Sequence, residues 1–446
     1  MKFYNKYLRP LFFSRRLYAA LVVVALVFVL SYWFSFLFEV ARLSLVFLVL
    51  LVLLDYISLF SKAGITVRRE APDRFSNGDP NKVNLVVKNN YAFRTSLNII
   101  DEIPVQFQQR NFKIALNLKP DTEVIAKYSL RPVERGEYIF HDIHAFTKSP
   151  LQLVVRRITI NAEQMVKVLP SFVTLRQYEI KAHSSNLAEA GNKRVRKLGA
   201  SLEFEQIKEY VRGDDIRTIH WKATARKGQL MVNNYTDERS QQIYCVIDKG
   251  RVMKMPFEGM SLLDYAINAT LILSKVALIK QDKIGLISFS DQLGSILVAD
   301  RKSDQMHNIL ETLYHEQTHF LESDFEKLYA LMRTRITGRS LVVLFTNFES
   351  MSGLERQLPY IRNIARHHLM LVVFFENTEL KQLTESPVDN TEDLYIKTIA
   401  EKFAHEKRLI VKELQKHGIL TILTTPQSLT VDAVNKYLEL KARHAI

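Results

Sequence analysis

One short segment contains the residue types of a zinc hydrolase. His315, Glu316 and His319 form a His-Glu-Xaa-Xaa-His sequence. On a continuous helix the two histidines would share one face and bind zinc, and the glutamate would act as a base toward a zinc-bound water. The segment, however, lies between two helical patterns and precedes Ser323-Asp324, a predicted helix cap. No third ligand stands at a convincing spacing, and so short a match also arises by chance, so zinc hydrolysis with His315 and His319 as ligands is kept as an alternative function.

The densest group of charged and aromatic residues lies between positions 203 and 226. A turn at Gly213, capping by Asp214 or Asp215 and a stop at Gly228 delimit a predicted helix. Apolar residues recur within it at the three-then-four spacing of a helix face that packs inward. These residues are Ile216, Ile219 and Ala223.

Two interpretations of this segment stay open. Its basic side chains suit a docking surface for an acidic or phosphate-bearing partner. The same side chains, with two aspartates nearby, also suit a capped and ion-paired connector that packs on the neighbouring domain. The residues of the candidate partner-binding motif are Arg212, Asp214, Asp215, Arg217, Trp221, Lys222 and Arg226.

Two apolar runs near the N-terminus predict a transmembrane helical hairpin within residues 1–62, with helices at about 17–38 and 40–60. The first run carries no charge, and the second carries only Arg42 and Asp55, near its two ends. About 20 helical residues cross the roughly 30 Å hydrocarbon layer of a bilayer, so each run is long enough. The first run is too long for the apolar part of a signal peptide, and the aromatic residues within it suit a membrane interface.

The distribution of positive charge predicts the orientation of this hairpin. Residues 1–16 contain five Lys and Arg residues and no acid, and three more basic residues follow the second run within positions 62–69. The turn between the runs offers only Arg42 beside Glu39. Because basic residues stay on the cytoplasmic side, we expect both termini and the main body in the cytoplasm. The single cysteine, Cys245, allows no intrachain disulfide and suits a reducing compartment.

The rest of the chain predicts two domains and a connector. Residues 63–160 contain short strand-like runs between turn signals, as in a small all-β sandwich. Residues 161–241 form a connector that carries the motif. In residues 242–446 apolar strands alternate with helices, the signature of a doubly wound α/β domain. The predicted strands span 242–248, 283–289, 294–299, 340–346, 368–375 and 419–424, and the predicted helices span 260–280, 304–314, 323–336, 353–367 and 391–417.

The motif segment resembles the hallmark of a bacterial family known as domain of unknown function 58. The resembling features are a Glu-Phe pair, a Tyr-Xaa-Xaa-Gly-Asp step and an Arg-Xaa-Ile-Xaa-Trp-Lys-Xaa-Thr-Ala-Arg sequence that ends at Arg226. Such proteins resemble this chain in having two membrane helices, a β-rich segment and a von Willebrand factor A-like α/β domain. The resemblance implies a place in the bacterial inner membrane, a MoxR-type AAA+ ATPase and other von Willebrand factor A-domain proteins as partners, and a role in assembly or envelope stress. It carries over no catalytic residue.

The resemblance to von Willebrand factor A domains also implies where a divalent metal would bind. Asp248 matches the first ligand of the metal loop, but Gly250 and Val252 stand where two serines belong, and Asn347 replaces a second aspartate. Because Mg²⁺ requires such oxygen ligands, we expect a degenerate metal-site loop and no cofactor, with Mg²⁺ binding at this loop as the alternative. Two basic residues beside Asp248 are expected to supply the positive charge that a metal ion would otherwise bring. They are Lys249 and Arg251.

The chain carries a formal net charge of +14 over 446 residues. Because the basic residues are scattered and no nucleic-acid motif is found, this charge indicates a surface beside anionic lipid, and a nucleic-acid-binding module stays an alternative. No Walker-type glycine loop occurs, so ATP hydrolysis would belong to a partner. The preferred hypothesis is a non-enzymatic scaffold or adaptor that is anchored in the bilayer and binds protein partners.

Overall fold

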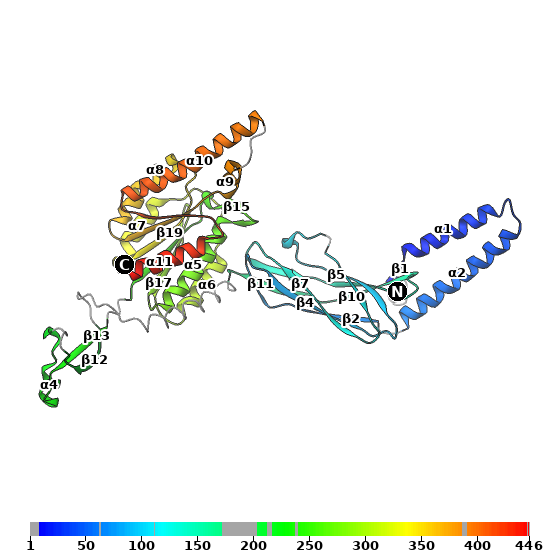
Figure 1. Ribbon diagram of the computed structural model, residues 1–446, viewed down its shortest axis with the longest axis horizontal. Coiled ribbons are helices and arrows are strands. Elements are labelled where there is room, and N and C mark those ends of the chain that lie inside the picture. The colour runs from blue at the N-terminus through cyan, green and yellow to red at the C-terminus, as the bar shows by residue number, and fades with distance from the viewer. Residues whose placement is uncertain are drawn as a thin grey trace. The chain divides into compact units, whose positions relative to one another are not determined.

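The computed structural model describes residues 9–61, 64–110, 112–171, 203–211, 216–236, 240–385, 390–443 and 445. The chain forms two compact units, Met1–Ser171 and Phe172–Ile446. The first contains a helical hairpin and a β-rich region, and the second contains the motif segment and an α/β region (Figure 1). A multidomain chain of these types is what the sequence predicts.

The hairpin consists of α1 (Arg15–Leu30) and α2 (Phe36–Phe60). Two helices are confirmed, but their predicted bounds are wrong, because the turn lies at residues 31–35 inside the first apolar run. The Ser31 hydroxyl donates to the Phe28 carbonyl at 2.6 Å, and the bulky side chains of Tyr32 and Trp33 are exposed. Serine hydroxyls compete for backbone groups and aromatic residues lose rotamer freedom in a helix, which favours a turn at this point.

Helix α2 is long and apolar enough to cross a membrane, with 25 residues and a mean hydropathy of 2.6. Helix α1 has 16 residues and is about 24 Å long at 1.5 Å per residue. Helix α5 (Leu262–Ile279) also passes a test of length and composition, but 78% of its apolar window is buried inside the protein. Helix α5 therefore serves as a core helix of the α/β region.

The β-rich region contains three sheets, with strand orders β1-β10-β9-β5-β6, β2-β4-β7 and β3-β11-β8. Apolar side chains of the first two sheets share one core, so these sheets pack face to face. The region ends with β11 rather than at the predicted position 160, because β11 pairs with both β3 and β8. The strands are β1 (Leu11–Phe13), β2 (Ile65–Glu70), β3 (Arg74–Ser76), β4 (Asn81–Asn89), β5 (Thr95–Asp101), β6 (Ile114–Leu118), β7 (Glu123–Leu130), β8 (Gly136–Phe140), β9 (Ile143–Lys148), β10 (Val154–Ile160) and β11 (Gln164–Leu169).

The hairpin is joined to the β-rich region through a buried carboxylate on α2. Asp55 is 1% exposed and accepts hydrogen bonds from the Ser149 hydroxyl and from the backbone amides of Leu153 and Val154, at 3.0 and 2.8 Å for the two amides. Strand β1, just before α1, pairs antiparallel with β10. Both ends of the hairpin are therefore attached to the same edge of the β-rich region.

The motif segment forms an antiparallel ribbon of β12 (Glu203–Glu209) and β13 (Met231–Thr236), with α4 (Trp221–Lys227) between them. A 3-10 turn at Ile216–Thr218 precedes the helix, and Ile219 bridges to Val232 of β13. Gly228 ends α4, as the sequence predicts, and its φ of +70° is the left-handed conformation that glycine commonly adopts after a helix.

The α/β region is built on a six-stranded sheet with the order β18-β17-β14-β19-β20-β21. All neighbours are parallel except β18, which pairs antiparallel with β17. Numbered along the chain, the order is 3-2-1-4-5-6, the doubly wound order. The strands are β14 (Gln242–Asp248), β17 (Lys283–Phe289), β18 (Leu293–Asp300), β19 (Leu341–Phe345), β20 (Leu369–Phe375) and β21 (Leu420–Thr424), with a small pair β15 (Pro256–Phe257) and β16 (Met260–Ser261) beside them.

Helices cover both faces of this sheet and form two separate cores. Helices α5, α6 and α11 contribute buried side chains to one core, and α7, α8 and α10 contribute to the other. All six predicted strands are present within one residue at each end, and the five predicted helices within two. The helices are α5, α6 (Gln305–His315), α7 (Phe325–Arg335), α8 (Met351–Ala365), α9 (Thr378–Glu385), α10 (Thr391–Lys416) and α11 (Leu429–Ala442).

Candidate functional site at the carboxyl edge of the sheet

Asp248 lies at the topological switch point of the sheet, at the carboxyl end of β14 and beside the end of β19. Ligands of open α/β sheets bind at such a point. The carboxylate is fully buried and accepts hydrogen bonds from the Thr346 hydroxyl at 2.6 Å, from the Gly250 amide at 2.8 Å and from the Ser323 hydroxyl. Burial raises the pKa of this carboxyl, and the three hydrogen bonds oppose part of that rise. Protein groups thus occupy both oxygens that a metal would require.

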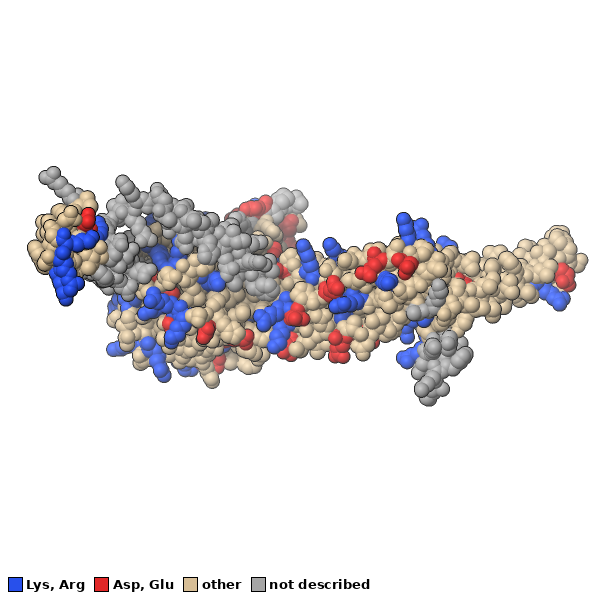
Figure 2. Space-filling view, turned by 90° about the horizontal axis from the view of Figure 1, so that it is seen from below, with Lys and Arg blue, Asp and Glu red and all other residues tan. Residues whose placement is uncertain are grey.

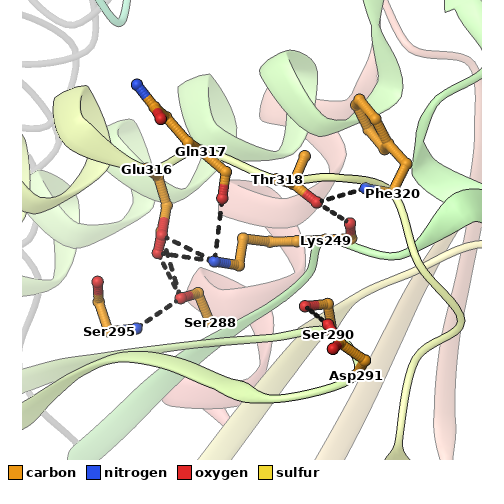
Figure 3. Close-up of polar contacts among 9 residues, drawn as sticks. All are labelled: Lys249, Ser288, Ser290, Asp291, Ser295, Glu316, Gln317, Thr318 and Phe320. Atoms are coloured by element: carbon orange, nitrogen blue, oxygen red, sulfur yellow. Dashed lines mark hydrogen bonds and ion pairs between the residues drawn. The ribbon is translucent and has the colours of Figure 1, made fainter.

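A buried ion pair lies next to Asp248. The Lys249 ammonium contacts the two Glu316 carboxylate oxygens at 3.3 and 3.2 Å and donates to the Gln317 carbonyl at 3.3 Å (Figure 3). The side chains of Lys249 and Glu316 are 10% and 3% exposed. Ser288, at the end of β17, donates to Glu316 at 2.5 Å. The pair is therefore desolvated and held by further hydrogen bonds, which is the condition for a buried ion pair to persist.

The segment 316–323, which we call the strap, crosses the carboxyl edge of the sheet and is bound to it at several points. The Thr318 hydroxyl donates to the Lys249 carbonyl at 2.6 Å, and the Arg251 amide donates to the Leu321 carbonyl at 2.9 Å. Ser323, at the end of the strap, donates to Asp248. Figure 3 shows the Glu316 carboxylate and the Gln317 backbone carbonyl directed at the Lys249 ammonium, while the Gln317 side chain points away from it. The strap thus covers the position of the predicted metal loop.

The structure does not provide the helix that the zinc alternative requires. Helix α6 ends at His315, and Glu316 is extended, with φ −64° and ψ 117°. The exposed His315 ring pairs with Glu311 at 3.6 Å, and Glu316 is committed to Lys249. His319 is exposed on the strap. The two histidines therefore do not share a helix face with the glutamate, and no group of three or more His, Cys, Asp or Glu side chains in the described part of the chain is arranged to hold a metal. Asp324 caps α7 as predicted, accepting from the Lys327 amide at 3.0 Å.

Lys249 and Arg251 do not supply positive charge to Asp248 in the way that the sequence predicts. Lys249 pairs with Glu316 rather than with Asp248, and the Arg251 side chain is exposed. Asn347, at the predicted second-aspartate position, instead accepts a hydrogen bond from the Lys407 ammonium of α10 at 2.6 Å. Burial lowers the pKa of Lys407 to about 8, with Glu349 opposing the shift.

The strap packs so closely against Gly250 that a side chain at this position would collide with it. A Cβ atom at this position would lie 1.9 Å from the Ser323 hydroxyl oxygen and 3.0 Å from the Leu321 carbonyl oxygen. A serine, which the metal-loop pattern has here, would therefore force the Ser323 hydroxyl away from its place beside Asp248 and press on the strap backbone. Val252 is half-buried and packs against one core of the sheet, so it too supplies no ligand to the loop.

Replacing Gly250 with serine is expected to destabilise the α/β region by about 1–3 kcal/mol, the usual range for overpacking. Thermal unfolding of the purified protein, with and without Mg²⁺, would measure the loss, and Mg²⁺ should not restore it. The matched control is Gly353→Ser, where the nearest atom to an added Cβ is 3.6 Å away. Adding Ser323→Gly should recover part of the stability of the Gly250 variant. Full stability of Gly250→Ser, or rescue by Mg²⁺, would contradict this account of the loop.

The motif segment presents a second candidate site. Trp221 is 70% exposed and Ile216 is 69% exposed, so the predicted inward packing of Ile216 is wrong. Lys222 and Arg226 are exposed on the same short helix as Trp221. Arg217 of the motif lies in the 3-10 turn before this helix. Three other motif residues lie outside the described residues. Those three are Arg212, Asp214 and Asp215.

Helix α4 is capped by a residue that the sequence does not single out. The His220 Nδ1 atom accepts a hydrogen bond from the Ala223 amide at 3.0 Å. The predicted capping residues, Asp214 and Asp215, lie outside the described residues. Thr224 accepts from the Met231 amide at 3.0 Å and joins α4 to β13. Histidine is not among the preferred N-cap residues, so no sequence signal marks this role.

The family described as "Protein of unknown function DUF58" matches residues 206–398, which cover most of the motif segment and much of the α/β region. We therefore assign this part of the chain to that family, as the sequence predicts. A curated relative is the "Uncharacterized protein YeaD" of Bacillus subtilis, 25% identical over 122 residues. That alignment covers 27% of this chain and 30% of the relative's length.

Two solved structures show a distant likeness to part of the chain. The CARDB domain of a Pyrococcus furiosus protein, solved in complex with di-metal ions, is 18% identical, with 24% of this chain and 87% of that chain covered and a TM-score of 0.18. A PapD-like domain of human CEP192 is 11% identical, with 24% and 86% covered and a TM-score of 0.19. Scores this low support no inference about fold or function.

Proposed function

We propose that this protein is a non-enzymatic adaptor, anchored in the bacterial inner membrane by α1 and α2, whose cytoplasmic body binds protein partners. The observation that carries the proposal is the exposed Trp221 with Lys222 and Arg226 beside it on α4. Binding hot spots in protein interfaces are enriched in tryptophan and arginine. The alternative role of the segment, an ion-paired connector packed inward, does not explain why these side chains are exposed.

The closed carboxyl edge of the sheet supports an adaptor rather than a metal-dependent enzyme. Asp248 is satisfied by two hydroxyls and an amide, and Lys249 and Lys407 are both bound to protein groups. The strand order and the place of Asp248 support a von Willebrand factor A-like domain whose metal loop has been replaced by internal contacts. Such an edge offers a preformed surface for a protein, since the strap holds it without a cation.

The partner that we propose is an AAA+ ATPase of the MoxR type, with other von Willebrand factor A-domain proteins in the same assembly, and with assembly or envelope stress as the process. The proposal rests on the family assignment of residues 206–398 and on the motif. A basic and aromatic surface on α4 would bind an acidic surface of such an ATPase. The length and hydropathy of α2 support the membrane anchor.

Affinity purification of the full-length protein from its own membranes tests this function. The wild-type protein should co-purify with an AAA+ ATPase, and Trp221→Ala/Lys222→Glu should reduce the recovered ATPase by at least about tenfold, because a hot-spot tryptophan contributes about 2 kcal/mol or more. The matched control is Tyr395→Ala/Lys402→Glu on α10, since Tyr395 is also 70% exposed. The control should retain the ATPase. No enrichment by the wild-type protein, or equal loss in both variants, would count against the proposal.

A further inference from the structure

A basic pocket opens where α1 leaves the β-rich region. Its volume is about 540 Å³, and its lining comes from the start of α1, from β1, β9 and β10, and from the segment before β6. Four of the lining residues are cationic and none is acidic. The cations are Arg15, Arg16, Lys113 and Lys148.

These four cations have no counter-charge within the described part of the chain. None of them takes part in an ion pair or a side-chain hydrogen bond there, whereas Arg69, in the same β-rich region, pairs with the buried Asp101. Four like charges around one pocket repel one another unless an anion lies between them. The pocket is therefore prepared for an anionic group that the chain itself does not supply.

The position of the pocket indicates the source of that anion. Helix α1 continues from Arg16 directly into apolar residues, and the Ser14 amide, just before α1, donates to the Leu153 carbonyl of the β-rich region at 3.0 Å. The exposed Phe13 side chain of β1 lines the pocket together with the cations. Figure 2 shows few charged side chains on the hairpin except near its tip, while Lys, Arg, Asp and Glu side chains are spread over the neighbouring β-rich region. The pocket thus lies where an apolar surface gives way to a charged one, as at a membrane interface.

We propose that this pocket binds the phosphodiester headgroup of an anionic lipid in the leaflet that the hairpin enters. The inference rests on the proposed membrane anchoring by α1 and α2. Guanidinium groups bind phosphate oxygens in pairs, and lysines add point charges, so two arginines from α1 and two lysines from the β-rich region would surround the phosphate. Phe13 and Val155 would contact the apolar part of the lipid next to its headgroup. The bound lipid would hold the β-rich region against the membrane.

Native mass spectrometry of the full-length protein tests the pocket. The protein is placed in nanodiscs of four parts phosphatidylcholine to one part phosphatidylglycerol and then released. The wild-type protein should retain phosphatidylglycerol, and Lys113→Gln/Lys148→Gln should retain about thirtyfold less, which corresponds to about 2 kcal/mol for the two lysines near an anionic lipid surface. The matched control is Lys88→Gln/Lys119→Gln. Lys88 and Lys119 are exposed and lie at the same end of the region, since Lys88 pairs with Thr66 just after α2. The control should retain the lipid.

Two further measurements separate the pocket from the anchor. Flotation with vesicles of phosphatidylcholine alone tests anchoring, and the wild-type protein and both variants should float equally. If none floats, the proposed anchoring fails, and the inference fails with it. If all float but retain equal phosphatidylglycerol, the pocket proposal alone is overturned. Displacement of the lipid by millimolar inorganic phosphate would also overturn it, because the pocket would then be a site for free phosphate.

Discussion

Lys249→Met should destabilise the α/β region by about 3–5 kcal/mol, the usual effect of removing one partner from a buried ion pair. The substitution leaves the Glu316 carboxylate, in a side chain that is 3% exposed, without its cation. It also removes the donor to the Gln317 carbonyl, so the strap loses an attachment. Hydrogen exchange of the β14 and β17 amides would measure the free energy of opening, which should fall by that amount.

The double variant Lys249→Met/Glu316→Leu provides the control for this prediction. Replacing both partners of a buried pair with apolar residues is often neutral, so the double variant should recover most of the loss. Two single variants that are each as stable as the wild-type protein would contradict a structural role for the pair. A double variant no better than the sum of the singles would show that the two residues do not act together.

Asp55→Ala should weaken the junction between the hairpin and the β-rich region by about 3 kcal/mol or more, while the pairing of β1 with β10 remains. The Ser149 hydroxyl and the amides of Leu153 and Val154 would lose their acceptor, and each buried donor without a partner costs about 1–3 kcal/mol. Hydrogen exchange of residues 149–154 in detergent-solubilised protein would report the change as lost protection at the two amides.

A second acidic residue on the same helix provides a control for Asp55. Glu39 lies near the other end of α2, and its side chain is 65% exposed and pairs with Arg42 at 3.9 Å. Glu39→Gln removes a charge of the same sign from the same helix and should leave residues 149–154 unchanged. Equal protection of these residues in the Asp55 variant and the wild-type protein would show that the carboxylate does not hold the junction.

The strands of the α/β region could be predicted because a strand that is buried on both faces has a continuous run of apolar residues in the sequence. Cys245 and its neighbours in β14 are an example, with six of the seven residues buried. The hairpin turn at residues 31–35 could not be predicted, because neither glycine nor proline marks it. Strand β11 was missed for a different reason, since its partners β3 and β8 lie far from it in sequence.

The candidate site could be predicted only in part. The sequence predicts that Asp248, Gly250 and Asn347 lie at one sheet edge, because strand ends of a doubly wound sheet meet there. Ser323 and Lys407 were missed, because they reach the edge from the strap and from α10 rather than from the metal loop. The His-Glu-Xaa-Xaa-His match points to Glu316, but α6 ends at His315, four residues before the second histidine of the match.

Photocrosslinking in living cells tests the central claim most directly. A photoreactive amino acid is placed at Trp221, and at Tyr395 as the equally exposed control. If the protein is an adaptor that uses its motif, irradiation should join position 221 to an AAA+ ATPase in the membrane fraction and should join position 395 to none. Capture of nucleic acid at position 221, or of no ATPase there, would contradict the account.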